Sequence, residues 1–161
     1  MTEDDKSEPE RALIFDYAAW EQKQQEYDCR FDELLLANKT ALFDVLSAAG
    51  IEIVDVNFDG YGDSGQIESM EAKGGDHVIE LPATQIDITM PVWDSLETHR
   101  QTMTVHDAIE HLVYAFLRKT HDGWANDDGA YGDFTFDVAD RTITLDYHER
   151  YTDTNYSHHS F

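Results

Sequence analysis

Residues 134–147 read Phe-Thr-Phe-Asp-Val-Ala-Asp-Arg-Thr-Ile-Thr-Leu-Asp-Tyr, and this stretch decides the fold class. Apolar residues alternate with polar ones at positions 134, 136 and 138, and again at 143, 145 and 147. A period of two is typical of a strand that buries one face. Residues 139–141, Ala-Asp-Arg, separate the two runs by the length of a short hairpin connection. The stretch therefore predicts a C-terminal β-hairpin.

Upstream of this hairpin, the chain shows a helical period in three places. Apolar residues recur at steps of three, four or seven over residues 16–37, 40–49 and 104–119. Thr40 and Thr104 can cap the second and third helices, and Asp107 follows Thr104 at the spacing of a capping box. Gly50 lies where a helix ending in a left-handed residue needs glycine. The pattern predicts about three helices.

Between the second and third predicted helices the period changes to two. Strands are predicted over residues 53–58, 66–72, 77–81 and 85–90, and the three glycines of residues 59–65 predict a loop. Strands so close in sequence cannot be joined by parallel crossovers, so the sheet should be antiparallel. We therefore expect an acidic flexible tail over residues 1–10. A single α+β domain should follow over residues 11–161, with its helices packed on one face of the sheet.

Composition limits the classes of function. The 161 residues include 34 Asp and Glu against 11 Lys and Arg, a net charge of −23. Such a charge repels nucleic acids and anionic membranes, which excludes direct binding to either. The single cysteine, Cys29, excludes an internal disulfide and a cysteine-based zinc cluster. No long apolar run and no apolar segment after the acidic N-terminus are present, so we expect a cytoplasmic protein.

The first acidic segment resembles the opening of a calcium-binding loop. Asp55, Asn57 and Asp59 alternate and are followed by Gly60, as calcium loops require. The twelfth position should hold a bidentate acid, but it is Gln66. The alternative is an acidic turn that ends a strand. These three residues are weak candidates for a calcium site, and no other cofactor is expected.

The second acidic segment, residues 123–133, combines two aromatic residues with glycines and aspartates. It could be a loop whose aromatic rings close over the core, or a recognition surface with an aromatic anchor ringed by carboxylates. The candidate binding residues of the two segments are Asp59, Asp63, Ser64, Glu68, Trp124, Asp127, Asp128 and Tyr131.

Catalytic chemistry finds no support in the sequence. His106 and Glu110 share one helical face, and Asp107 and His111 the adjacent one, but the order differs from the His-Glu-x-x-His zinc motif. A solvated helix face with ion pairs explains these residues. No pair of base and nucleophile can be named, so no catalytic residue is predicted.

The two glycine-acid segments also carry a resemblance. Residues 58–68 and 123–132, followed by Phe-Asp-Val at 136–138 and residues 143–147, resemble a family of uncharacterised acidic proteins. Its members occur in bacterial genomes, on plasmids and on other mobile elements. The resemblance covers residues 51–161. It implies that the two segments belong together and that the protein has a mobile-element context, and it implies no activity.

Three hypotheses of function follow. The first is an acidic interaction module for a basic protein surface, acting as a nucleic-acid mimic that inhibits a DNA- or RNA-binding enzyme of the anti-restriction or anti-CRISPR type. The second is a salt-adapted protein whose charge serves solvation. The third is a small calcium- or ligand-binding domain built on the two glycine-acid segments.

Overall fold

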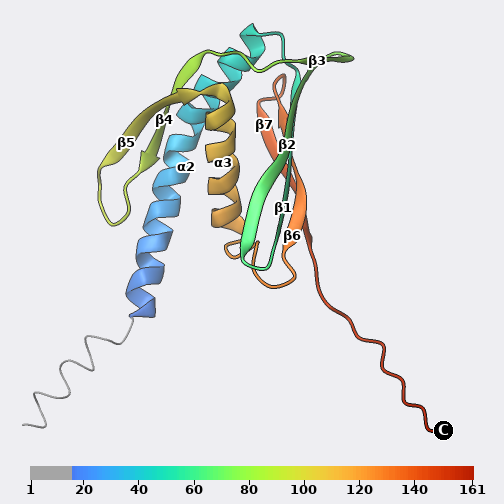
Figure 1. The fold of residues 1–161 in the computed structure, drawn as a ribbon. Coiled ribbons are helices and arrows are strands. Elements are labelled where there is room, and N and C mark those ends of the chain that lie inside the picture. Colours follow the sequence, from blue (N-terminus) through green and yellow to red (C-terminus); the bar gives the residue numbers. More distant parts are fainter. Residues whose placement is uncertain (1–15) are drawn as a thin grey trace, which may run out of the picture. The chain divides into compact units, whose positions relative to one another are not determined.

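The computed structural model describes residues 16–161 (Figure 1). The helices are α2 (Tyr17–Ala48) and α3 (Val105–Thr120), and the strands are β1 (Ile53–Tyr61), β2 (Ser64–Gly74), β3 (His77–Ile79), β4 (Gln85–Pro91), β5 (Thr98–Thr104), β6 (Ala130–Asp137) and β7 (Thr142–Glu149). The predicted α+β class is confirmed.

The main sheet has five strands in the order β3-β2-β1-β6-β7, and every pairing is antiparallel. The predicted C-terminal hairpin is confirmed: β6 and β7 pair from Asp137 opposite Thr142 to Ala130 opposite Glu149. Arg141 turns the chain between them with a positive φ of 54°. Strands β4 and β5 form a separate two-stranded sheet.

The prediction of about three helices is wrong, because residues 16–161 contain two. The predicted helices 16–37 and 40–49 are one continuous helix, α2, which includes Thr40. A threonine is a good cap but not a helix breaker, and the junction contains neither glycine nor proline. The end of α2 is as predicted, since Gly50 has a φ of 76° and the Ile51 amide donates to the Leu46 carbonyl, as in a Schellman motif.

The predicted loop over residues 59–65 is also wrong. Strands β1 and β2 continue through it, and only Gly62 and Asp63 form the turn. Both have positive φ angles, 58° and 70°, which suit a two-residue hairpin turn. The other two glycines, Gly60 and Gly65, are paired strand residues over which the ring of Trp124 packs. They mark a close approach to the backbone rather than a break in the strand.

The chain folds as two compact units. Of the described residues, the N-terminal unit comprises 16–36 and 89–100, and the sheet unit comprises 37–88 and 101–161. The predicted boundary at residue 10 lies outside the described residues, and the single domain over 11–161 stays a prediction. Neither helix in residues 16–161 combines the length and the hydropathy that a membrane crossing needs.

The core of the sheet unit lies between the helices and one face of the sheet. Phe43 of α2 contacts Phe136 with ring centroids 6.4 Å apart, and Phe116 of α3 contacts Phe134 at 6.1 Å. Residues 134 and 136 point to the same face of β6, so both helices contact that face. The opposite face of the sheet carries the polar residues of the alternating pattern. We call it the outer face.

Candidate functional site

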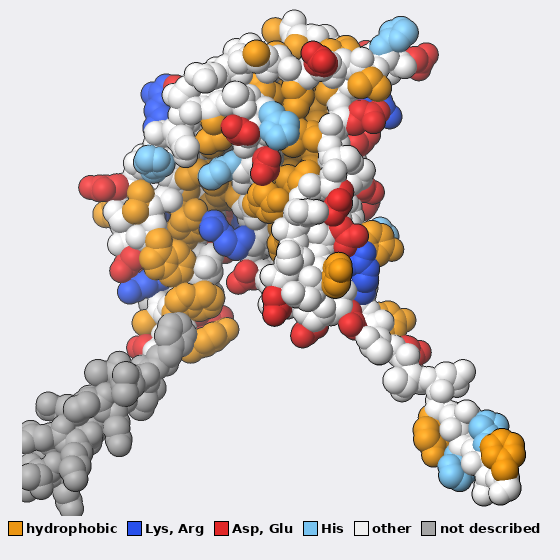
Figure 2. Space-filling model, viewed as in Figure 1, with side chains coloured by type: hydrophobic (Ala, Val, Ile, Leu, Met, Phe, Trp, Pro, Cys, Tyr) orange, Lys and Arg blue, Asp and Glu red, His pale blue; other side chains and the backbone are white. Residues whose placement is uncertain are grey.

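The two glycine-acid segments meet in the structure. The amides of Gly62 and Asp63 in the β1–β2 turn donate to the carbonyls of Asp127 and Ala125, at 3.0 and 2.9 Å. Gly129 lies so close to β1 that a Cβ there would overlap the carbonyl oxygen of Gly60. Backbone contacts therefore hold the second segment against the end of the β1–β2 hairpin. Figure 2 shows Asp and Glu side chains gathered at this end of the sheet.

Trp124 closes this end of the core. Its half-buried ring meets Phe58 edge-on, with centroids 5.4 Å apart and an interplanar angle of 84°. The same ring covers Gly60 and Gly65, where an added Cβ would lie within 3 Å of it. Of the two interpretations of this segment, the packing of an aromatic ring over the core is the one that describes Trp124.

Arg150 joins two of the predicted site residues. Its Nη1 lies 2.9 Å from Oδ1 of Asp59, and its guanidinium lies 4.7 Å from the ring centroid of Tyr131. Tyr131 also stacks on His148 of the adjacent strand, with centroids 4.8 Å apart. Asp59 is therefore ion-paired within the molecule. Tyr131 lies on the outer face, where Arg150 and His148 contact its ring.

The remaining predicted site residues surround the two segments. Ser64 and Glu68 line, together with Asp59, a shallow cavity of about 350 Å³ beside the β1–β2 hairpin. Asp63 and Asp127 are exposed turn residues with positive φ angles, and exposed Asp128 accepts a hydrogen bond from Thr152.

The three candidate calcium ligands are not brought to one point. Asp55, Asn57 and Asp59 lie at alternate positions of an extended strand, where neighbouring side chains on one face are about 6.7 Å apart. Each has its own partner: Asp55 accepts from Thr135, Asn57 donates to Ser69, and Asp59 pairs with Arg150.

The outer face of the sheet brings Asp55 together with three acids that the sequence analysis did not single out. Asp133 of β6 lies directly opposite Asp146 of β7, and Asp55 of β1 lies directly opposite Glu71 of β2. These four residues, which we call the acidic sheet face, line one shallow cavity of about 370 Å³. Three of the four are exposed and Asp55 is half-buried. The alternating pattern that predicts the hairpin could have identified these acids, because each of them occupies an outward position of its strand.

Opposed carboxylates cost stability. Like charges directly opposite each other on neighbouring strands destabilise a sheet. Two such pairs occur on this face. Lys73 lines the same cavity, and its Nζ lies 3.3 Å from Oε1 of Glu71 on β2. The acidic sheet face therefore holds four carboxylates against one cation, Lys73, among the residues that line the cavity.

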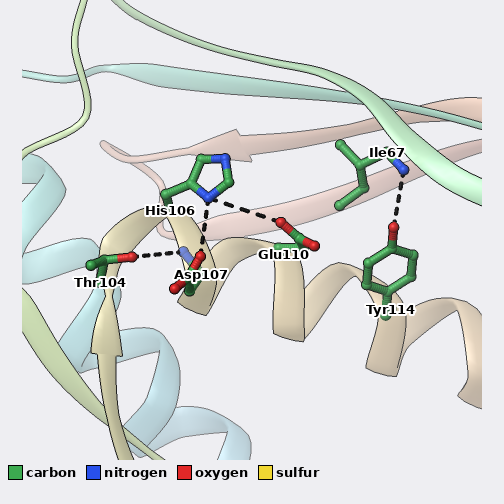
Figure 3. Close-up of polar contacts among 6 residues, drawn as sticks. All are labelled: Ile67, Thr104, His106, Asp107, Glu110 and Tyr114. Carbon is green, nitrogen blue, oxygen red and sulfur yellow. Dashed lines mark hydrogen bonds and ion pairs between the residues drawn. The ribbon is translucent and has the colours of Figure 1, made fainter.

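A second group of ionisable residues lies at the start of α3 (Figure 3). Nδ1 of His106 lies 3.3 Å from Oδ1 of Asp107 and 3.9 Å from Oε2 of Glu110, close enough for a shared metal ion. All three side chains are more than two-fifths exposed. The positive end of the helix dipole favours carboxylates here and opposes a metal cation. Thr104 caps the helix by accepting from the amide of Asp107, so the predicted capping residue is confirmed.

Two groups in the sheet unit have perturbed protonation. Burial, together with the charge of Arg118, lowers the pKa of His111 on α3. Burial, with the nearby charge of Glu149, raises the pKa of Tyr147, whose ring stacks on His121 at a centroid distance of 3.6 Å. Neither residue belongs to the acidic sheet face.

Comparison with known proteins identifies the family. The model of a family of unknown function, DUF6878, matches residues 34–161, and the chain belongs to that family. No curated protein and no solved structure matches the chain.

Proposed function

We propose that this member of the DUF6878 family is an acidic interaction module that binds a basic protein surface through its acidic sheet face. The observation that carries the proposal is the pair of opposed carboxylates, Asp133 with Asp146 and Asp55 with Glu71. A partner that brings cations between these carboxylates would relieve their repulsion, and the energy stored there would favour binding.

The chemistry of the face favours an arginine- or lysine-rich groove as the partner. Neighbouring strands are about 4.8 Å apart and outward residues about 6.7 Å apart along a strand, so the carboxylates form a closely spaced grid. Carboxylates accept paired hydrogen bonds from arginine, as phosphates do. Nucleic-acid grooves of enzymes present such cations to the dense charge of DNA. We therefore propose a nucleic-acid mimic that occupies the groove of a DNA- or RNA-binding enzyme, a role consistent with a mobile-element context.

The test compares two charge-matched variants. D133N/D146N removes two charges from the acidic sheet face, whereas D76N/E80Q removes two exposed charges beside β3. Each variant serves as bait for host lysate at about 50 mM and about 500 mM salt, with duplex DNA as competitor. We expect the wild type and D76N/E80Q to retain a nucleic-acid enzyme at low salt and to release it to DNA.

D133N/D146N should retain that enzyme poorly. Equal retention by the two variants would contradict the assignment of the binding face. If no basic protein is retained by the wild type at low salt, the mimic is excluded and the charge serves solvation.

A further inference from the structure

The N-terminal unit carries a chain of four aromatic rings. Tyr17 contacts Trp20 with centroids 5.8 Å apart, and Trp93 contacts both Trp20 at 6.4 Å and Tyr27 at 6.0 Å. Three of the rings lie on one stripe of α2, at steps of three and seven, and Trp93 comes from the connection between β4 and β5. We call these four residues the aromatic patch. Figure 2 shows hydrophobic side chains on the surface in this region.

The aromatic patch is more open than a core would be. Tyr17 is 62% exposed and Trp93 is 41% exposed, whereas Phe31, farther along the same helix, is 2% exposed. Trp20 and Tyr27 are half-buried. Contiguous tryptophan and tyrosine rings that are partly exposed are the composition of protein-binding hot spots.

We propose that the aromatic patch is a second docking site, which takes a lysine- or arginine-bearing segment of a partner protein. One carboxylate lies on the same stripe of the helix as the rings, because Glu21 is four residues after Tyr17. Asp94 follows Trp93 on the hairpin. A cation over the ring faces gains a cation–π interaction and meets these carboxylates at the rim.

Charge favours a basic segment at the aromatic patch over a second copy of the chain or an anionic membrane. The described residues of the unit hold eight acids against three bases, Lys23, Arg30 and Arg100. Lys23 is paired with Asp94 at 3.1 Å. A second copy would bring another net charge of −23 to the interface, and an anionic membrane would be repelled. A basic segment reduces the repulsion that either of these would increase.

The site is separate from the acidic sheet face. Three of its four rings precede residue 34, where the match to the family model begins. The two sites lie in different units, so each can be tested without altering the other. The proposal therefore goes beyond the proposed function and does not depend on it.

The test uses a nona-arginine peptide and pairs of exposed aromatic residues. Y17L/W93L removes two rings from the aromatic patch and keeps every charge. Y151L/Y156L removes two rings that are 83% and 84% exposed in the C-terminal residues of the sheet unit. Each exposed cation–π contact contributes about two- to fivefold in affinity, so we expect Y17L/W93L to bind the peptide about 4- to 25-fold more weakly. Y151L/Y156L should match the wild type in the same calorimetric titration.

Tryptophan fluorescence locates the bound peptide. The chain has three tryptophans, and W20F/W93F leaves only Trp124 of the sheet unit. We expect the peptide to change the fluorescence of the wild type and to leave that of W20F/W93F unchanged. Y17L alone, at an exposed position near the helix start, repeats the affinity measurement if Y17L/W93L loses helical circular dichroism.

Three results would overturn the proposal. The first is that Y17L/W93L and Y151L/Y156L weaken the binding of the peptide equally, or that neither weakens it, because net charge alone would then hold the peptide. The second is a concentration-dependent dimer that Y17L/W93L abolishes. The third is binding of the wild type, through the same rings, to anionic vesicles but not to the peptide. D133N/D146N should leave the fluorescence change intact, so a failure here is distinguishable from a failure of the acidic sheet face.

Discussion

The packing of Trp124 over a glycine pair makes a sharp prediction about Gly65→Ala. Gly60 and Gly65 are directly opposite on β1 and β2, and both lie beneath the Trp124 ring. A Cβ at Gly65 would lie 2.6 Å from Cζ3 of Trp124 and 2.9 Å from the Cβ of Ala125. The φ angle of Gly65 is not in the left-handed region, so the backbone accepts alanine, and the Trp124 ring and the Cβ of Ala125 must move.

The expected cost follows from three terms. Overpacking a closely packed site costs about 1–3 kcal/mol. Displacing the ring also weakens its edge contact with Phe58, and such aromatic pairs contribute about 0.5–1.5 kcal/mol. Replacing glycine by alanine in the unfolded chain returns about 0.4–1 kcal/mol. We therefore expect G65A to lower the free energy of unfolding by about 2 kcal/mol, within a range of about 0.5–4 kcal/mol.

A double-mutant cycle isolates the contact. Urea unfolding followed by far-ultraviolet circular dichroism gives the free energy of unfolding for the wild type, G65A, W124A and G65A/W124A. Without the indole ring, G65A should cost much less than in the wild type, because only the contact with the Cβ of Ala125 remains. If G65A costs the same in the W124A background as in the wild type, the ring is not what requires glycine, and the reasoning is refuted.

Three further predictions concern the sheet and α3. D133N removes one of two opposed carboxylates and should raise the free energy of unfolding by a few tenths of a kcal/mol up to about 1 kcal/mol. Salt at about 1 M should reduce this gain, because it screens the repulsion between the carboxylates. An unchanged urea midpoint at low salt would show that Asp146 does not repel Asp133. H111Q tests the lowered pKa of His111. Because burial favours the neutral imidazole in the folded chain, the wild type should lose stability relative to H111Q as the pH falls from about 8 to about 5. A difference in the free energy of unfolding between the two proteins that does not change with pH would contradict this prediction. T104A removes the side chain that accepts from the amide of Asp107 and should cost about 1 kcal/mol in thermal or urea unfolding, whereas a cost near zero would mean that the cap contributes nothing.

Local patterns predicted the elements that local forces determine. The β6–β7 hairpin follows from alternation over residues 134–147, and α3 begins at its predicted cap, Thr104. Strand β5 was missed because Thr98–Thr104 has no apolar alternation and leaves most of its residues exposed. Its pairing with β4 is a tertiary property that no pattern within the strand encodes.

The glycines illustrate the limit of local reasoning. Three glycines in residues 59–65 predict a loop, but only Gly62 is in the turn. Gly60 and Gly65 are needed by Trp124, about sixty residues away in sequence, and that requirement appears only when the chain has folded.

The candidate site was predicted in part. The association of the two glycine-acid segments, expected from the family resemblance, is present as backbone hydrogen bonds between residues 62–63 and 125–127. The acidic sheet face was not predicted, because its members come from four strands whose order depends on the placement of β6 beside β1. Each strand alone shows one or two outward acids, and only the register of the sheet places Asp133 opposite Asp146.

The most direct test of the central claim is the dissociation constant of the purified enzyme retained in the lysate experiment, measured at low salt for the two charge-matched variants. Losing a charge pair at the centre of an interface costs far more than losing a distant surface charge. We expect D133N/D146N to bind at least about tenfold more weakly than D76N/E80Q, which should stay close to the wild type. Equal dissociation constants for the two variants would contradict the account, since the partner would then sense net charge rather than the acidic sheet face.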